Sequence, residues 1–439
     1  MTPEVKAETF RARRKRFMDK IAAGATAILP SAPVSIRSGD VEFVYRQDSD
    51  FHYLTGFTEP ESIAMFSPGH PDGEFVMFVR PRDKERETWT GRRAGVEGAI
   101  TEFGADKAYV AEELEKVLPR YLAKSERVHF PFGLNQQFEE RIMKLIHWAQ
   151  SMRPRVGVGP SSILDPREAI HEMRICKEPG ELELMRRAMA ISAEAHKRAM
   201  TVARGGMMEW QVEAEVDYTF RKNGAAGPSY PSIIASGPNA ATLHYINNDR
   251  ELRTGELLLL DAGAEYDFYA ADITRTWPIG ARFSGLQRAI YDIVLEAQLK
   301  AISIVKPGVR HEDPHETALR VLVDGMRHLG LLQGSAEEII EKGDYRRFYM
   351  HRTSHWLGMD VHDVGLYRID GKSRMLEPGM VLTVEPGFYI AQDDEEAPES
   401  FRGIGVRIED DVLVTESGHE VMTAAAPKSV ADIESLTAA

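Results

Sequence analysis

Four acidic residues in the second half of this 439-residue chain lie in segments with the pattern of β-strands, and the segments of Asp261 and Glu385 have the apolar composition of buried strands. Asp261 ends ELLLLD, Asp272 begins DITRT, Glu385 follows MVLTV and Glu409 follows GVRI. Carboxylates gathered in one buried place raise each other's pKa and lose their charge unless cations balance them. A fold that brings these segments together therefore needs a positive partner, and a fifth residue of metal-ligand type, His355 in TSHWLGMDVHD, completes the set.

Two divalent ions would balance four ionised carboxylates. Such ions lower the pKa of a bridging water, so that a hydroxide exists near neutral pH, and they polarise a scissile carbonyl. A ligand set of carboxylates with one imidazole favours Mn²⁺, with Co²⁺, Zn²⁺ and Fe²⁺ as alternatives. The sequence therefore predicts a site for two divalent metal ions and a hydrolytic reaction.

Each acid taken alone also has a simpler structural explanation. Asp261 could cap a turn, Asp272 could pair with Arg275, and Glu409 could be a solvated strand residue, since most carboxylates are surface groups. The joint pattern favours a site because the strands around Asp261 and Glu385 are apolar. Buried acids of this kind need a partner or a metal.

Histidines accompany these acids. The segment HRTSHWLGMDVHDVG holds His351, His355 and His362, and His244 lies earlier in the chain. Three histidines so close together are more typical of a site than of a surface loop. The HExxH zinc motif is absent because position 352 is Arg. A histidine beside metal ions can donate a hydrogen bond to a developing oxyanion.

Charge and cysteine content restrict the class of protein. The net charge of −14 and the pI near 5.6 argue against a nucleic-acid partner. One cysteine, Cys176, allows no intramolecular disulfide, which is consistent with a reducing cytoplasm. The basic N-terminus lacks the apolar core of a secretory signal, and no apolar run reaches the ~18 residues of a membrane span. We expect a cytoplasmic protein with no membrane contact.

The first part of the chain alternates between helical and strand-like patterns, which predicts an α/β domain. We expect helices over residues 11–23, 111–124 and 136–152, and a strand over 27–29. SIAMFSP and EFVMFVRP are predicted as paired strands, and YRQDSDFHYLTGF as a loop followed by a strand.

A stretch rich in Pro, Gly and Ser over residues 154–166 indicates the end of this domain. With one further helix placed before the boundary, we predict domains 1–173 and 174–439. A long helix should begin near residue 178. The candidate ligands Asp261, Asp272, Glu385 and Glu409 should project from strands, with Arg407 on the same face as Glu409.

These motifs resemble the Xaa-Pro aminopeptidases (aminopeptidase P), metallopeptidases with the pita-bread fold. The resemblance runs along the whole chain, from YRQDSDFHYLTGFTEPES and ETWTGRRAG to YPSIIASGPNAATLHY, LLLLDAGAEYDFYAADITRT, HRTSHWLGMDVHDVG, MVLTVEPGFYI and FRGIGVRIEDD. It implies an α/β (α+β) chain: a creatinase-like N-terminal α/β domain, then a pita-bread catalytic domain with a curved antiparallel sheet flanked by helices.

The resemblance also implies roles for residues at matching positions. The metal ligands would be Asp261, Asp272, His355, Glu385 and Glu409, with Asp272 and Glu409 bridging the ions. Glu385 would be the general base, His244 an oxyanion donor, His351 and His362 substrate-site residues, and Arg407 a substrate contact near the proline. Tyr230 and Tyr389 would line the pocket, and Trp89 would reach a neighbouring subunit, which implies a homo-oligomer (dimer or tetramer). Arg352 stands where the family commonly has a small residue.

The implied activity is removal of the N-terminal residue from peptides with proline in second position. An Xaa-Pro bond is a tertiary amide without an N–H, so general peptidases that bind this group are poorly suited. The free amine of the peptide would bind near Asp261 and fix the scissile bond.

The sequence leaves four alternative functions open. A prolidase would cleave Xaa-Pro dipeptides, and organophosphate esters in some cases, with Arg407 clamping the carboxylate. A methionine aminopeptidase normally lacks so large an N-terminal domain. A creatinase-like hydrolase works without metals. A non-catalytic binding protein of this fold would have lost ligands and gained basic tails, whereas the tail PKSVADIESLTAA is not basic.

Overall fold

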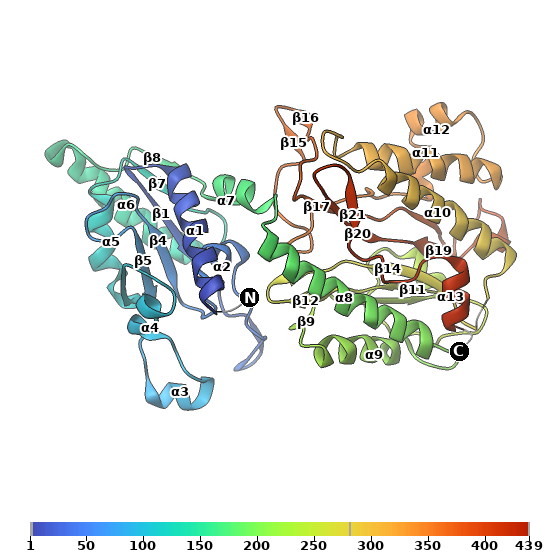
Figure 1. Ribbon diagram of the computed structural model, residues 1–439, viewed down its shortest axis with the longest axis horizontal. Helices are drawn as coiled ribbons and strands as arrows, with labels where there is room; N and C mark the ends of the chain where they lie inside the picture. Colours follow the sequence, from blue (N-terminus) through green and yellow to red (C-terminus); the bar gives the residue numbers. More distant parts are fainter. Residues whose placement is uncertain (1–2, 281, 438–439) are drawn as a thin grey trace. The chain divides into compact units, whose positions relative to one another are not determined.

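The computed structural model describes residues 3–280 and 282–437. The chain divides into two compact units, Met1–Met173 and Arg174–Ala439 (Figure 1). The stretch over residues 154–166, which is rich in Pro, Gly and Ser, is not a linker between the units. It forms the end of a helix, α6, and an edge strand, β8, of the N-terminal unit.

The N-terminal unit is built on a mixed six-stranded sheet in the order β6-β5-β4-β1-β7-β8. The strands β1, β4 and β5 pair antiparallel, whereas β5–β6, β1–β7 and β7–β8 pair parallel. The strands of this unit are β1 (Ala25–Pro30), β2 (Ile36–Ser38), β3 (Val41–Glu42), β4 (Ile63–Phe66), β5 (Phe75–Val79), β6 (Lys107–Val110), β7 (Arg127–His129) and β8 (Ser162–Leu164). The predicted pairing of SIAMFSP with EFVMFVRP is confirmed by β4 and β5.

Helices cover this sheet and close its core. They are α1 (Pro3–Ile21), α2 (Ser49–Thr55), α3 (Lys84–Thr90), α4 (Gly95–Thr101), α5 (Leu114–Leu122), α6 (Gln136–Val156) and α7 (Arg167–Arg174). Apolar side chains of α5 and α6, such as Leu118 and Ile146, share one buried cluster with Val76 and Val128 of the sheet. On α1, Phe17 packs edge-on against the ring of Phe66 at 5.3 Å.

One prediction for this unit is wrong. The segment predicted as a loop followed by a strand contains the helix α2, in which every residue is buried. Asp48 caps its start by accepting a hydrogen bond from the backbone N–H of Phe51, and Gly56 ends it in the left-handed conformation.

The C-terminal unit contains short antiparallel sheets: β10-β11-β14, β17-β20-β21, β18-β19 and β13-β12-β9. Their strands are β9 (Gly227–Pro228), β10 (Ile233–Ser236), β11 (Leu257–Asp261), β12 (Ala264–Tyr266), β13 (Tyr269–Ala270), β14 (Thr274–Pro278), β17 (Val381–Val384), β18 (Gly387–Ile390), β19 (Ile404–Arg407), β20 (Asp410–Val414) and β21 (His419–Val421). A separate hairpin joins β15 (Arg368–Ile369) to β16 (Lys372–Ser373).

Helices flank these strands on two sides (Figure 1). They are α8 (Pro179–Val202), α9 (Glu209–Lys222), α10 (Gly285–Ser303), α11 (Asp313–His328), α12 (Ala336–Lys342) and α13 (Val430–Thr437). One large apolar cluster joins helix residues such as Val212 and Val294 to strand residues such as Leu258 and Leu382. This packing holds the ends of the strands rigidly, so that side chains at these ends keep fixed positions relative to one another.

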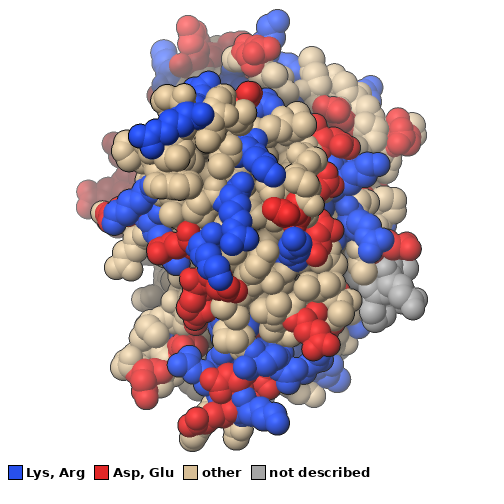
Figure 2. Space-filling model, turned by 90° about the vertical axis from the view of Figure 1, so that its left-hand side faces the viewer, with Lys and Arg blue, Asp and Glu red and all other residues tan. Residues whose placement is uncertain are grey.

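Two surface properties accompany this fold. Among the described residues, no helix is both long and apolar enough to cross a membrane. On the face shown in Figure 2, Lys and Arg side chains lie among Asp and Glu side chains. Interspersed signs of this kind differ from the continuous basic surface typical of a nucleic-acid-binding protein.

Candidate metal centre

Two aspartates come from one pair of neighbouring strands. Asp261 is the last residue of β11 and lies opposite Thr274 of β14, while Asp272 precedes β14 by two residues. Between them Gly263 lies so close to the backbone of Ala271 that a Cβ atom would be 1.7 Å from its carbonyl oxygen. Only glycine permits this approach, which brings the segments carrying the two carboxylates together.

Two glutamates come from two further breaks between strands. Glu385 lies between β17 and β18, and Glu409 lies between β19 and β20. The backbone N–H of Glu409 donates to the carbonyl of Thr274 at 3.0 Å, which ties this break to β14. Glu409 was expected to project from a strand, but residues 404–415 do not form one continuous strand, because the chain leaves one sheet and joins another at Glu409.

The expectation that the acids project from strands holds only for Asp261. Asp272, Glu385 and Glu409 lie just outside strand ends, where the backbone is free to turn a carboxylate inward. His355 lies in a segment without regular structure, and its carbonyl accepts a hydrogen bond from the backbone N–H of Thr383 on β17.

All five predicted ligands line one cavity of about 490 Å³, called here the ligand cavity. His355 Nε2 is 3.4 Å from Asp272 Oδ2 and 3.6 Å from Glu385 Oε1. Asp272, His355 and Glu409 each offer a ligand atom, and these atoms lie within 4.8 Å of one another. A metal ion at this place would be held by oxygen atoms and one imidazole nitrogen.

The raised pKa values of these acids show that nearby positive side chains do not fully balance their negative charge. Burial, together with the neighbouring carboxylates, raises the pKa of Glu409 well above its ordinary value. Burial raises the pKa of Glu385 to about 7, although the charges of His355 and Arg407 oppose the shift. Burial also raises the pKa of Asp261. Divalent cations would reverse these shifts by stabilising the ionised forms.

The contacts of the Tyr230 hydroxyl with two carboxylates also indicate that the negative charge of the site is not balanced. Its hydroxyl oxygen is 2.6 Å from Asp261 Oδ1 and 2.6 Å from Asp272 Oδ1. A phenol carries one proton and can donate to only one of two ionised carboxylates. The second short contact requires a proton or a cation, so the donor set fits a group of divalent metal ions.

Arg407 is committed to protein partners. Its Nη2 donates to Asp261 Oδ2 at 2.6 Å, its Nη1 to the hydroxyl of Tyr389 at 3.1 Å, and its Nε to Thr274 Oγ1 at 3.0 Å. Tyr389 also contacts His351 Nε2 at 2.8 Å. Arg407 and His351 line the ligand cavity, and Tyr389 fixes both from behind.

The remaining predicted residues divide between the two units. His244 and His362 line the ligand cavity, and the His362 ring centroid is 4.5 Å from that of His355. Trp89 lies on α3 of the N-terminal unit with 85% of its surface exposed. The structure thus brings together every predicted site residue of the C-terminal unit, and the role of Trp89 stays a prediction.

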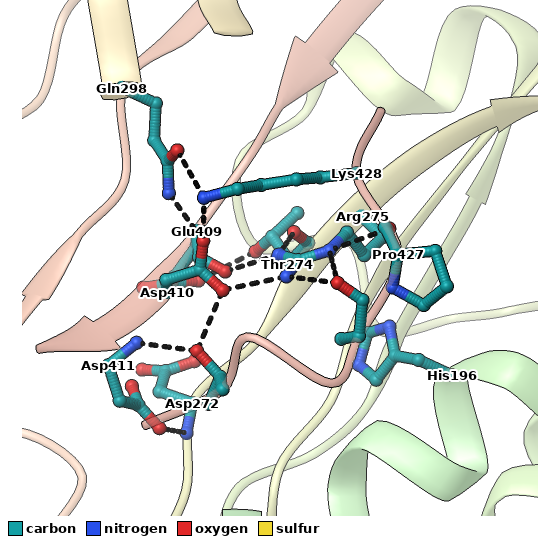
Figure 3. Close-up of polar contacts among 12 residues, drawn as sticks. His196, Asp272, Thr274, Arg275, Gln298, Glu409, Asp410, Asp411, Pro427 and Lys428 are labelled. Carbon is teal, nitrogen blue, oxygen red and sulfur yellow. Dashed lines mark hydrogen bonds and ion pairs between the residues drawn. The ribbon is translucent and has the colours of Figure 1, made fainter. Parts of the chain in front are cut away.

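A buried charge network, which no sequence motif predicted, lies behind the ligands (Figure 3). Arg275 Nη2 donates to Asp410 Oδ1 at 2.7 Å, and both side chains are fully buried. Lys428 and Gln298 donate to the other oxygen of Asp410 at 2.6 and 2.7 Å. Arg275 Nη1 also donates to the backbone carbonyl of Glu409 at 2.5 Å, so this network holds the segment that carries a ligand.

Two further contacts support the ligands directly. Thr274 Oγ1 donates to Glu409 Oε2 at 2.7 Å, and the backbone N–H of Asp272 donates to Asp411 Oδ2 at 3.1 Å. Arg275 in an apolar strand and the acid pair after Glu409 were the sequence signals available for these groups. Neither signal identifies its partner.

Comparisons with known proteins agree with this geometry. Residues 183–416 match the metallopeptidase family M24, and residues 10–129 match the N-terminal domain of aminopeptidase P. The chain is 42% identical to the Xaa-Pro aminopeptidase of Escherichia coli K12 over 99% of both chains. It is 34% identical to human Xaa-Pro aminopeptidase 3 over 99% of this chain and 87% of the relative.

Solved structures give the same result. Aminopeptidase PepP of Pseudomonas aeruginosa matches with a TM-score of 0.96 at 49% identity, covering 98% of each chain. Aminopeptidase P of E. coli with the inhibitor Pro-Leu matches with a TM-score of 0.94 at 42% identity, again over 98% of each chain. The predicted fold, an N-terminal α/β domain followed by a pita-bread domain, is confirmed.

Proposed function

We propose a function for this chain on the premise that it belongs to metallopeptidase family M24. It is a metal-dependent aminopeptidase that removes the N-terminal residue from peptides with proline in second position. One observation carries this function: four carboxylates, of which Asp261, Asp272 and Glu409 are buried, meet His355 in one cavity, in a chain similar along its whole length to Xaa-Pro aminopeptidases.

The proposed metal ligands are Asp261, Asp272, His355, Glu385 and Glu409, with Asp272 and Glu409 shared between two ions. When bound, these ions supply a water that is nucleophilic at neutral pH, and they polarise the scissile carbonyl. Manganese is the proposed metal because the donors are mostly hard oxygen atoms, while a zinc-substituted form of the E. coli relative has been solved with its product.

The protein side chains then have separate roles. Glu385 accepts the proton of the attacking water. His244, in the cavity wall, donates to the oxyanion, and His351 and His362 orient the peptide beside the proline. Arg407, already bonded to Asp261 and Tyr389, holds these two side chains in place together with Tyr230. The peptide amine lies at the Asp261 end of the cavity.

The commitment of Arg407 to Asp261 also bears on the alternative of a prolidase. A prolidase needs a cation free to bind the carboxylate of a dipeptide, and Arg407 Nη2 is buried in an ion pair of 2.6 Å. Together with the Xaa-Pro aminopeptidase relatives, this contact favours cleavage of longer peptides.

Two finer parts of the proposal concern assembly and location. We propose a homo-oligomer, a dimer or tetramer, in which the exposed Trp89 reaches a neighbouring subunit. A cytoplasmic location is consistent with a single free cysteine, Cys176. Sedimentation of the wild type and of Trp89→Ala, with activity measured on both, tests the first part.

A competition experiment tests the function. Protein loaded with Mn²⁺ receives an Xaa-Pro-Xaa tripeptide, an Xaa-Pro dipeptide and a Met-Ala-Xaa tripeptide in one mixture, and mass spectrometry follows the products. The proposed function predicts loss of the first residue from the proline tripeptide. Preference for the dipeptide would identify a prolidase, and preference for Met-Ala-Xaa a methionine aminopeptidase.

A further inference from the structure

A second cavity adjoins the ligand cavity within the C-terminal unit. It has a volume of about 480 Å³ and is called here the side cavity. Both cavities share Arg352, Ser354, His355 and His362. The rest of its lining comes from the segment before and at the start of α11 and from the β15–β16 hairpin: His311, Glu312, His315, Tyr367, Arg368 and Ser373. The side cavity therefore opens on the His355 side of the ligand cavity, away from Asp261.

The side cavity holds one uncommitted positive charge. Arg368 Nη2 pairs with Glu312 at 3.0 Å, and its Nη1 donates to the carbonyl of Gly371. Glu312, the one acid among the lining residues, also receives a hydrogen bond from Arg310 at 2.9 Å. The exposed guanidinium of Arg352 has no hydrogen bond or ion pair within residues 3–280 and 282–437. A negative group entering this cavity would therefore meet Arg352 first.

The two deeper histidines add neutral polar atoms. Burial lowers the pKa of both His311 and His315 to about 4, and the positive charge of Arg352 contributes to both shifts. His315 Nδ1 contacts Thr353 Oγ1 at 2.9 Å, whereas the buried His311 Nε2 has no partner among the described residues. A cation beside an unpaired neutral imidazole suits a ligand with one negative charge and several acceptor atoms, such as a carboxylate.

We propose that the side cavity is a subsite for a carboxylate that lies after the proline of the substrate, with Arg352 as its ion-pair partner. This inference rests on the proposed function. With the peptide amine at Asp261 and cleavage between Asp261 and His355, the chain after proline leaves past His355 and His362, which are the residues shared with the side cavity.

The carboxylate has two possible sources: the C-terminus of a short peptide, or an Asp or Glu side chain. Four substrates with the metal-loaded enzyme separate them: Ala-Pro-Ala, Ala-Pro-Ala-amide, Ala-Pro-Glu-amide and Ala-Pro-Gln-amide. We expect the acid form of one pair to have the higher kcat/KM, by about fivefold through KM, as an exposed ion pair allows. A preference for Ala-Pro-Ala over its amide identifies the C-terminal carboxylate as the ligand. A preference for Ala-Pro-Glu-amide over Ala-Pro-Gln-amide identifies the side-chain carboxylate.

Two variants decide whether Arg352 is responsible. Arg352→Met should abolish the preference for the acid forms, without lowering the melting temperature because the side chain is exposed. Arg368→Met is the matched control, since it removes a cation of the same cavity that is already paired, and the preference should persist. Equal rates for acid and neutral forms in the wild type, or a preference that survives Arg352→Met, would overturn the proposal.

A binding measurement keeps this test independent of turnover. Calorimetry on the metal-loaded enzyme compares Pro-Ala with Pro-Ala-amide, and Pro-Glu-amide with Pro-Gln-amide. We expect the acid form of the pair that shows the kinetic preference to bind about fivefold more tightly to the wild type and equally to Arg352→Met. If no tripeptide is cleaved, the proposed function fails. In that case binding alone tests the subsite, and equal binding of the acid and neutral forms of both pairs to the wild type would overturn it.

Discussion

The carboxylate of Glu209 accepts a hydrogen bond of 2.7 Å from the hydroxyl of Tyr245, the residue that directly follows His244. Glu209 is fully buried at the start of α9 and also accepts from the backbone N–H groups of Ser236 and Arg250. One carboxylate therefore ties both ends of the segment 236–250, which carries His244 in its middle.

We predict that Glu209→Gln slows turnover and leaves the metal content unchanged. The NH₂ of the new amide faces groups that donate hydrogen bonds to Glu209 in the wild type. The lost hydrogen bonds cost about 1–3 kcal/mol of unfolding free energy and loosen the segment around His244. Denaturant unfolding, kcat and bound metal measured on one preparation check this. Glu213→Gln on the same helix is the control, and an equal loss of kcat in both variants would contradict the role of Glu209.

Asp272→Ala and His362→Ala should separate metal binding from turnover. Asp272 is a proposed bridging ligand, so its loss should remove metal and lower the rate by more than about 100-fold. His362 lines the cavity without being a proposed ligand, so its loss should keep the metal and lower the rate by about 100-fold. Elemental analysis with initial rates checks both. Full metal content and turnover in Asp272→Ala would show the bridging assignment to be wrong.

Removal of metal should reveal the cost of ionising Glu385. Burial raises its pKa from 4.5 to about 7. A raised carboxyl pKa means that the folded state holds the proton more tightly, so stability falls as pH rises from the unfolded pKa to the folded one. The free energy of unfolding of metal-free Glu385→Gln should therefore equal that of metal-free wild type near pH 4 and exceed it by about 3 kcal/mol at pH 8. Urea unfolding of both proteins across this range checks the prediction, and a constant difference would contradict it.

The pair Arg275–Asp410 should be costly to break. Both side chains are fully buried, and Asp410 also accepts hydrogen bonds from Lys428 and Gln298. Asp410→Asn leaves the buried Arg275 and the partly buried Lys428 short of a counter-charge and should cost about 3 kcal/mol of unfolding free energy. The exposed pair Arg288–Asp292 provides the control, since Asp292→Asn should cost less than about 1 kcal/mol. Similar losses in the two variants would contradict this view of the network.

Some of the fold follows from local pattern. The apolar run that ends in Asp261 forms β11, and a long helix, α8, begins at Pro179, as expected near residue 178. These segments are long or uniform enough for their own composition to decide their structure.

Two failures have identifiable local and long-range causes. In 51–57 the aromatic residues Phe51, Tyr53 and Phe57 alternate as in a strand, yet all of α2 is buried and helical, so tertiary packing overrides the pattern. Its capping signals, Asp48 and Gly56, were present in the sequence. The break at Glu409 depends on a hydrogen bond to Thr274, more than 100 residues away, and local pattern holds no trace of it.

Some residues of the site could be predicted from the sequence and others could not. The candidate ligands were predictable because acids in apolar strands are unusual, and the geometry gathers all five. Arg275, Asp410 and Thr274 were not, because a buried ion pair or hydrogen bond depends on which distant segments meet. The commitment of Arg407 to Asp261 could also be found only from the structure.

A metal titration tests the central claim most directly. Metal-free protein receives Mn²⁺ in steps, native mass spectrometry counts the ions bound per chain, and release of the first residue from an Xaa-Pro-Xaa tripeptide is followed on the same samples. We predict no turnover without metal and full turnover when two ions are bound. Full turnover in protein shown to hold no metal, or no cleavage with two ions bound, would contradict a two-metal Xaa-Pro aminopeptidase.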